Sequence, residues 1–183
     1  MPRPAAAQAW TLGAAAQVNQ DWTAPDAVNH PPTVVVTPSV SMAIAVEGSR
    51  VLTERVRIEG FLERPQTRTT VAHDPSGVFL FRRSDHTDTA GGAFAMRVAE
   101  TGRMTTRVLV GGAAVRHFVE RNFGGPDAPS SRYGFAAVFG ASADWPIHAR
   151  IRMIITARLF VPFGQTDDGQ VMLRPGVGLR WAW

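Results

Sequence analysis

The sequence predicts an all-β fold: an antiparallel, up-and-down, eight-stranded transmembrane β-barrel. First, apolar and polar residues alternate along most of the chain, as expected for strands whose successive side chains point to opposite faces. Second, eight such segments are joined by connections that are alternately short and longer. Third, no apolar run approaches the roughly 18 residues that a membrane helix needs, so a membrane role requires strands.

The composition suits a single domain and excludes several kinds of site. The 183 residues include no cysteine, so neither a disulfide framework nor a thiolate metal site can form. All 19 residues of the Lys and Arg class are arginine, and the net charge is +4. Because the arginines are dispersed along the chain, we expect no nucleic-acid partner.

Residues 1–9 are interpreted separately from the barrel domain, which we place at 10–183. They lack the charged and apolar portions of a signal peptide but contain Ala7-Gln8-Ala9, a small-x-small cleavage pattern. We interpret them as the residual tail of a signal peptide, with an Ala-rich disordered leader as the alternative.

The first four strands are expected at 10–21, 33–47, 51–66 and 87–99. The first places Trp10, Leu12 and Val18 on its apolar face. We expect a tight turn at Gly48-Ser49.

The third strand carries four charges on one face, two of each sign. After it, residues 65–86 form the longest irregular stretch, in which the apolar segment 78–81 is either a strand extension or a small loop hairpin. The fourth strand sets Phe94 and Met96 on its apolar face, and residues 100–103 form a turn.

The last four strands are expected at 105–121, 133–145, 149–163 and 171–183. The first of these alternates least decisively, and we place Leu109 and Val115 on its apolar side and Arg116 on its polar side. In the next, Tyr133 and Trp145 stand at the ends of an apolar row. Their spacing is close to the length of a tilted membrane-spanning strand.

The closing segment, VMLRPGVGLRWAW, places seven apolar residues on one face and two arginines on the other. Its terminal aromatic residue and the alternating apolar positions before it resemble the closing strand of bacterial outer-membrane β-barrels. The alternation of short turns and longer loops is also typical of these barrels. Over 10–183 the chain resembles the small eight-stranded, porin-like proteins of the Gram-negative cell envelope.

This resemblance implies a monomer in the bacterial outer membrane, with both termini periplasmic and the long loops extracellular. The expected partners are outer-membrane lipid, lipopolysaccharide, and the barrel-assembly machinery through the C-terminal strand; no cofactor is expected. Proteins of this class serve as adhesins, membrane-stabilising proteins, narrow conduits or lipid-modifying enzymes. The resemblance therefore predicts location and fold better than activity.

If the apolar face contacts lipid, the polar face fills a narrow lumen. An eight-stranded barrel has room only for its own side chains, and buried charges must be paired. We therefore predict a plugged lumen with an arginine–carboxylate network, and an anion-favouring conduit is the alternative. The predicted members are Arg55, Arg57, Glu59, Glu63, Arg97, Arg116, Glu120, Arg150, Arg152, Arg158, Arg174 and Arg180, with Glu47 and Asp144 as further counter-ions.

Two further sets of residues are expected at the membrane surfaces. The membrane-interface aromatics are Trp10, Tyr133, Trp145, Trp181 and Trp183. The outer-rim arginines, which either bind lipopolysaccharide phosphates bidentately or only solvate the loops, are Arg64, Arg68, Arg82, Arg83, Arg121 and Arg132.

We do not expect an enzyme. Ser84, Asp85, His86, Asp88 and His117 could supply a rim active site, but a hydrophilic loop explains them equally well.

The sequence contains no metal-binding or phosphate-loop motif. Asp167-Asp168-Gly169 could contact calcium but reads as a turn.

The rival fold is a soluble lipocalin-like barrel that binds an apolar ligand. In that fold the faces invert, so that arginines meet water and apolar side chains line a cavity. The cavity would be lined by Val40, Ile44, Ile58, Phe135, Phe139, Ile155 and Leu179.

Overall fold

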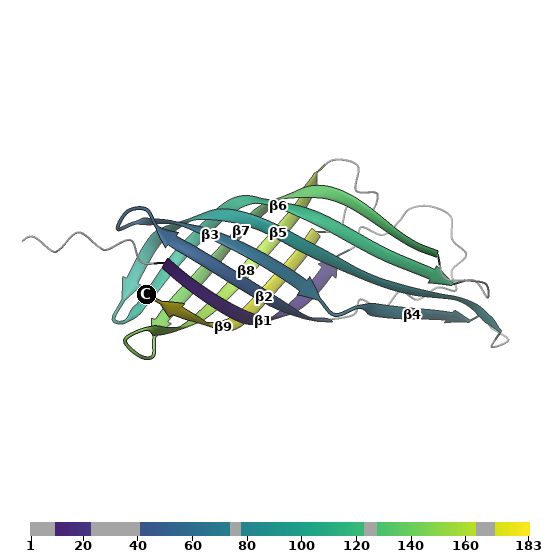
Figure 1. Cartoon of the computed structure of the whole chain (residues 1–183), viewed down its shortest axis with the longest axis horizontal. Helices are drawn as coiled ribbons and strands as arrows, with labels where there is room; N and C mark the ends of the chain where they lie inside the picture. Colours follow the sequence, from purple (N-terminus) through teal and green to yellow (C-terminus); the bar gives the residue numbers. More distant parts are fainter. Residues whose placement is uncertain (1–9, 23–40, 74–77, 123–127, 164–170) are drawn as a thin grey trace, which may run out of the picture.

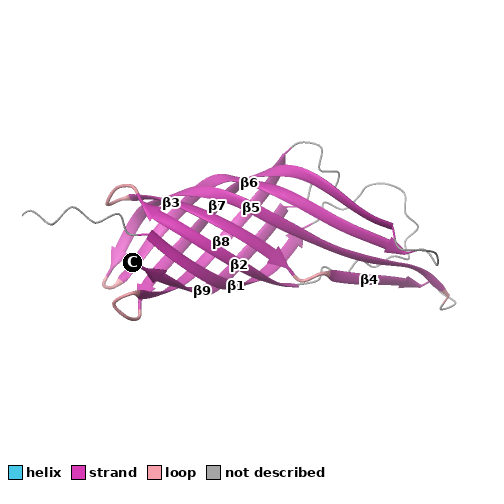
Figure 2. Cartoon of the chain, in the orientation of Figure 1, coloured by secondary structure: helices cyan, strands magenta, loops and turns pink. Residues whose placement is uncertain are grey.

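The computed structural model describes residues 10–22, 41–73, 78–122, 128–163 and 171–183, which form one antiparallel β-sheet closed into a barrel (Figure 1). Strands and tight turns make up this part of the chain (Figure 2), and no helix in it is long and apolar enough to cross a membrane. The strands are β1 (Trp10–Trp22), β2 (Ser41–Val51), β3 (Val56–Pro65), β4 (Arg68–His73), β5 (Phe79–Thr101), β6 (Met104–Asn122), β7 (Ala128–Pro146), β8 (Ile151–Phe163) and β9 (Val171–Ala182).

Eight strands form the ring, as predicted. Neighbours follow the order β3-β2-β1-β9-β8-β7-β6-β5, and β5 pairs back with β3. The first and last strands close the ring, with Thr11 opposite Ala182 and the Trp183 N–H donating to the Trp10 carbonyl at 3.2 Å. The described ends of the barrel therefore lie together, at the end that carries the short turns (Figure 1).

The stretch 65–86, predicted to be irregular, is mostly strand. β4 pairs with the first part of β5, from Arg68 opposite Asp85 to a register shift at Ala72/His73. Both interpretations of 78–81 hold in part, because β5 extends back to Phe79 and this extension pairs with β4 as a hairpin. Polar residues occupy both faces of this hairpin, so it lacks the alternation that marks a strand with one face in lipid.

The turn predicted at Gly48-Ser49 is also wrong. Gly48 lies within β2, opposite Leu12 of β1 and Gly60 of β3. The chain reverses at residues 52–55, where the Leu52 and Thr53 N–H groups donate to the Val56 carbonyl at 2.9 and 3.0 Å. Glycine here lies in mid-strand, where an added Cβ would come no closer than 3.7 Å to the Thr11 carbonyl oxygen, and does not mark a reversal. The predicted turn at 100–103 is confirmed, with Gly102 at φ 62°.

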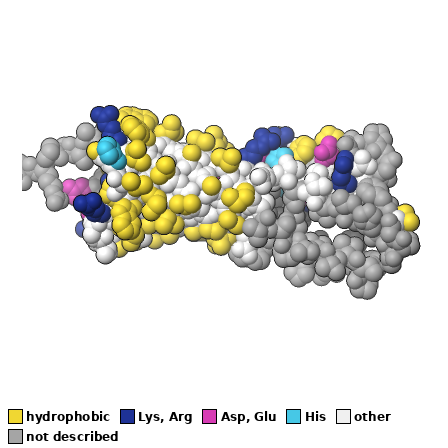
Figure 3. Space-filling model, turned by 90° about the horizontal axis from the view of Figure 1, so that it is seen from below, with side chains coloured by type: hydrophobic (Ala, Val, Ile, Leu, Met, Phe, Trp, Pro, Cys, Tyr) yellow, Lys and Arg dark blue, Asp and Glu magenta, His cyan; other side chains and the backbone are white. Residues whose placement is uncertain are grey.

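The apolar faces point outward and form a continuous hydrophobic band with arginines at its margins (Figure 3). The phase is the predicted one on β1, β2, β3, β7, β8, β9 and the barrel part of β5. The lipocalin-like alternative is wrong because its described cavity residues are exposed on the outer surface. These are Ile44, Ile58, Phe135, Phe139, Ile155 and Leu179; Val40 and the rest of 33–40 lie outside the described residues.

On β6 the predicted phase is wrong. Leu109, Val115 and Val119 are buried in the lumen, whereas Val110 and Arg116 are exposed outside. Both faces of this strand are largely apolar, so alternation does not identify the lipid face. Pairing with β5 and β7 decides it.

Candidate functional site: the lumen network and the outer rim

A chain of ion pairs crosses the lumen. Arg158 donates from Nη1 to Glu63 Oε1 at 2.6 Å and from Nη2 to Glu47 Oε1 at 2.8 Å. Arg174 donates to Glu63 Oε2 at 2.9 Å, and Arg180 donates to Glu47 Oε2 at 2.8 Å. All five side chains are at most 1% exposed. Each carboxylate is therefore shared between two arginines that reach it from β8 and β9.

Nearer the short turns, Asp144 forms the second centre of the network. Arg57 Nη1 and Arg180 Nη1 donate to it at 2.6 and 3.3 Å, and Arg107 also pairs with it. Arg57 pairs in addition with Glu59. Five buried or half-buried arginines thus meet four buried carboxylates, which leaves one positive charge in excess.

Neutral groups complete the pairing of Arg174. Arg174 donates from Nε to Asn19 Oδ1 at 2.9 Å and from Nη2 to the Thr87 carbonyl at 2.9 Å. Its guanidinium also lies 5.1 Å from the ring centroid of Phe160. Hydrogen bonds to neutral acceptors reduce the cost of burying this charge.

Apolar side chains fill the lumen beside the network, which the sequence analysis did not anticipate. The cluster of buried residues consists of Phe61, Ala113, Val115, Ala136, Val138, Phe160 and Met172. Phe61 and Phe160 meet edge-to-face with centroids 6.0 Å apart. Arg158, Arg174 and Arg180 therefore do not line a water-accessible passage in the described barrel.

Several predicted network members lie elsewhere. Arg55 and Arg150 are exposed in turns, and Arg97 pairs locally with Glu100 at 3.0 Å. Alternation predicts which face of the sheet a side chain occupies, but not its position along the barrel axis. Residues of the inward face that lie at strand ends are therefore outside the lumen.

The remaining misplacements concern the end of β6. Arg116 and Glu120 have the outward phase of β6. Arg152 keeps the predicted inward phase of β8 and is half-buried near the start of that strand. Arg107 shares the inward phase of Leu109, and the phase predicted for β6 does not place it in the lumen.

The predicted interface aromatics are all exposed. Trp10, Trp145 and Trp181 lie near the turn end of their strands, as does the terminal Trp183, and Tyr133 lies toward the loop end of β7. Arg50 stacks on Trp10 at 5.2 Å from the ring centroid.

The structure does not gather the predicted rim arginines into one site. The Arg64 guanidinium lies 3.8 Å from the Asp88 carboxylate, and Arg83 pairs with Asp85 at 3.4 Å. Arg82 and Arg132 are exposed on the extended strands, while the side chains of Arg68 and Arg121 lie outside the described residues.

The residues considered for rim chemistry do not form a triad. The Ser84 hydroxyl lies 3.1 Å from that of Thr69, and His86 Nε2 lies 3.6 Å from Asp88 Oδ2. His117 has the inward phase of β6 and bonds the Thr87 hydroxyl at 2.9 Å.

Among the described residues no group of three or more His, Asp or Glu side chains could hold a metal ion. The Asp167-Asp168-Gly169 segment lies outside them.

Sequence comparison gives no relative, since no protein-family model and no curated protein matches the chain. Solved structures do match. Neisserial surface protein A (NspA) has a TM-score of 0.65 at 8% identity, over 94% of this chain and 96% of NspA. Ail, the attachment invasion locus protein of Yersinia pestis, has a TM-score of 0.61 at 9% identity, over 96% and 99%. OprG of Pseudomonas aeruginosa, an outer-membrane protein, has a TM-score of 0.54 at 9% identity, over 97% and 96%.

These similarities cover nearly the whole chain and concern the fold, because the identities are too low to carry residue roles. The outward apolar band and the buried charges support the same fold, because a barrel in a membrane exposes apolar side chains to lipid and buries its charges. This chain therefore has the fold of the small eight-stranded bacterial outer-membrane β-barrels.

Proposed function

We propose that this chain is an integral outer-membrane protein with a plugged lumen, which acts structurally and through surface contacts and not as a pore or an enzyme. The observation that carries this proposal is the inversion of the usual soluble pattern. Ile44 and Leu62 are 69% and 62% exposed, whereas Arg174 and Arg180 are 0% and 1% exposed. Such surfaces are stable in a bilayer and not in water.

The surface contact that the rim favours is with lipopolysaccharide. Arg64, Arg82 and Arg132 are exposed beyond the apolar band, and arginine matches phosphate oxygens bidentately. Ail, a barrel of the same fold, has been solved with sucrose octasulfate, a heparin analogue and thus a polyanion. This is consistent with anion binding on this fold.

The orientation and the assembly route are part of the same proposal. Both described ends of the barrel and its short turns lie at one end, which we assign to the periplasm (Figure 1). The extended ends of β5, β6 and β7 then project outside the cell. The barrel-assembly machinery would engage β9, and the protein would remain a monomer.

The first test is folding. The full chain should give a compact band on unboiled gels only when it is refolded with detergent or lipid. Cooperative folding in plain buffer would contradict membrane insertion.

The second test is lipopolysaccharide binding. The double variant Arg82→Gln/Arg132→Gln should bind vesicles containing lipopolysaccharide more weakly than the unchanged chain. Arg103→Gln, an exposed arginine in the turn at the opposite end, is the matched control. Equal binding by all three proteins would remove the assigned rim contact.

A further inference from the structure

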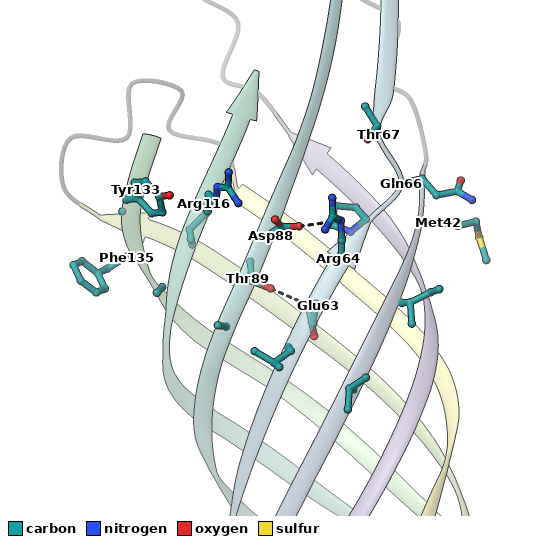
Figure 4. Close-up of a pocket in the computed structure, with 18 residues that line it drawn as sticks. Met42, Glu63, Arg64, Gln66, Thr67, Asp88, Thr89, Arg116, Tyr133 and Phe135 are labelled. Carbon is teal, nitrogen blue, oxygen red and sulfur yellow. Dashed lines mark hydrogen bonds and ion pairs between the residues drawn. The ribbon is translucent and has the colours of Figure 1, made fainter. Parts of the chain in front are cut away.

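An open groove of about 1050 Å³ runs across the outer face of the barrel near its loop end (Figure 4). It crosses β2, β3, β5, β6 and β7, and most of the side chains at its walls have the outward phase. Ile44 and Leu62 form one wall, and Tyr133 and Phe135 form the other. The groove therefore opens to the medium around the barrel and not to the lumen.

The groove exists because β5 and β6 lack large outward side chains there. The register aligns Leu62, Ala90, Ala114 and Phe135 in one row across four strands. The next row toward the turns begins with Gly60, Gly92 and Gly112. In these two rows the outward side chains of β5 and β6 are only Ala or Gly, and they lie between two walls of large side chains. We call this stretch the bare strip.

The length of the bare strip matches one leaflet of a membrane. It is bounded on β5 by Asp88 at the loop end and Phe94 at the turn end, six residues apart. At about 3.3 Å per residue this is about 20 Å along the strand. For a strand tilted by about 40° it corresponds to about 15 Å along the membrane normal, half of a hydrocarbon core of about 30 Å.

The mouth of the groove is cationic. One row across the strands contains Arg64, Asp88, Arg116 and Tyr133, which surround the mouth in Figure 4. The Arg64 side chain is 73% exposed and lies 3.8 Å from Asp88. Arg116 lies 5.9 Å from the Tyr133 ring centroid and donates to Ser131 Oγ at 3.3 Å. Two arginines thus flank Asp88, which also lies 3.6 Å from His86 Nε2, so the arginine charge at the mouth exceeds that of the one carboxylate.

The groove is lined on β5 by Asp88, Thr89 and Ala90, and it opens toward the turn end onto the rest of the bare strip. An apolar groove that continues into a strip about one leaflet long, with a cationic mouth, is complementary to an amphiphile with an anionic head. We propose that this groove holds one acyl chain of a lipopolysaccharide molecule, with a headgroup phosphate bound between Arg64 and Arg116. The assignment rests on the proposed function, because it is the orientation given there that places the groove in the outer leaflet. It deepens that function from a diffuse contact along the rim to a site for one lipid.

The test uses the full chain refolded in detergent and titrated with rough-form lipopolysaccharide, read by native mass spectrometry. One molecule should be retained per barrel. Ala114→Phe fills the floor of the groove, and Arg64→Gln/Arg116→Gln removes the charges of the mouth. Each should weaken binding by roughly tenfold or more. For the arginine variant, this is the factor that corresponds to losing one charged hydrogen bond.

Matched controls separate these effects from damage to the fold. Ala141→Phe adds the same bulk to an exposed position on β7 toward the turn end, and Arg103→Gln removes an exposed charge there. Both should bind as the unchanged chain does. Dephosphorylated lipopolysaccharide should bind weakly to every variant.

Three results would overturn the assignment. Normal binding by both groove variants would overturn the groove assignment. If in that case Arg82→Gln/Arg132→Gln lost binding, the rim contact would stand without the groove. Equal retention of phosphatidylglycerol would reassign the groove to phospholipid. A dimer that Ala114→Phe dissociates would show a second copy of the chain as the occupant. No lipopolysaccharide binding by the unchanged chain would instead remove the lipopolysaccharide contact of the proposed function, on which the groove assignment rests.

Discussion

Arg158 links Glu63 to Glu47 across the lumen, with N–O distances of 2.6 and 2.8 Å to the two carboxylates. Its guanidinium also lies 4.7 Å from the ring centroid of Phe61. One side chain thus connects the charge network to the apolar cluster, and removing it should disturb both.

Arg158→Leu should lower the free energy of unfolding by about 3 to 5 kcal/mol, because it removes a buried charged hydrogen bond from each of Glu47 and Glu63. Urea unfolding in lipid vesicles, followed by tryptophan fluorescence, measures this change. Arg103→Leu, at an exposed turn position, should change it by no more than about 0.5 kcal/mol. Equal stabilities would show that Arg174 and Arg180 suffice to compensate the two carboxylates.

A charge introduced into the apolar band should lower the free energy of unfolding, and by more the closer it lies to the middle of the band. Phe139 lies on β7 opposite Val110 and Leu159 and is 47% exposed to the surroundings of the barrel. Phe139→Arg should cost about 2 to 4 kcal/mol in the same unfolding assay. Ile147→Arg, in the turn after β7, should cost about 0 to 1 kcal/mol. Similar costs at both positions would contradict burial of the band in lipid.

Glycines on the lumen face should tolerate a larger side chain less well than glycines on the lipid face. A Cβ on Gly176 would lie 2.5 Å from Gln17 Cγ and 2.8 Å from the Ala16 carbonyl oxygen. A Cβ on Gly112 would come no closer than 3.8 Å to the Ala136 carbonyl oxygen. Gly176→Val should therefore reduce the folded fraction on heat-modifiable gels, and Gly112→Val should leave it unchanged. The reverse order would invalidate the assigned phases.

The plugged lumen predicts no sustained ion current across planar bilayers that contain the folded protein. The reason is that Arg158, Phe160 and Arg174 are at most 1% exposed within the lumen. Arg97→Ala, which alters an arginine outside the network, should be equally silent. A steady anion-selective current through the unchanged chain would support the conduit instead.

The absence of cysteine allows a direct test of orientation, since a single introduced thiol is the sole reactive site. Leu80→Cys lies on the extended part of β5, and Arg103→Cys lies in a short turn. A membrane-impermeant maleimide should label Leu80→Cys on intact cells and Arg103→Cys only after the outer membrane is permeabilised. The opposite labelling would reverse the assigned topology.

The sequence by itself determined the number of strands in the ring and the phase of most of them. On β7 and β9 one face is uniformly apolar, from Tyr133 to Trp145 and from Val171 to Trp183, so alternation alone identifies the lipid side. The same alternation placed Arg57, Arg158, Arg174 and Arg180 inside. It worked because a bilayer requires every mid-strand residue of one face to be apolar.

The tertiary structure alone decided the phase of β6, the position of each residue along the barrel axis and the identity of its partners. A period of two residues gives a face, but it does not say which strand lies opposite or where the lipid ends. The pairing of Glu63 with Arg158, 95 positions apart, exists only because the ring closes with one particular stagger. The same stagger aligns Ala90 with Ala114 and Gly92 with Gly112, which creates a groove that no single strand contains.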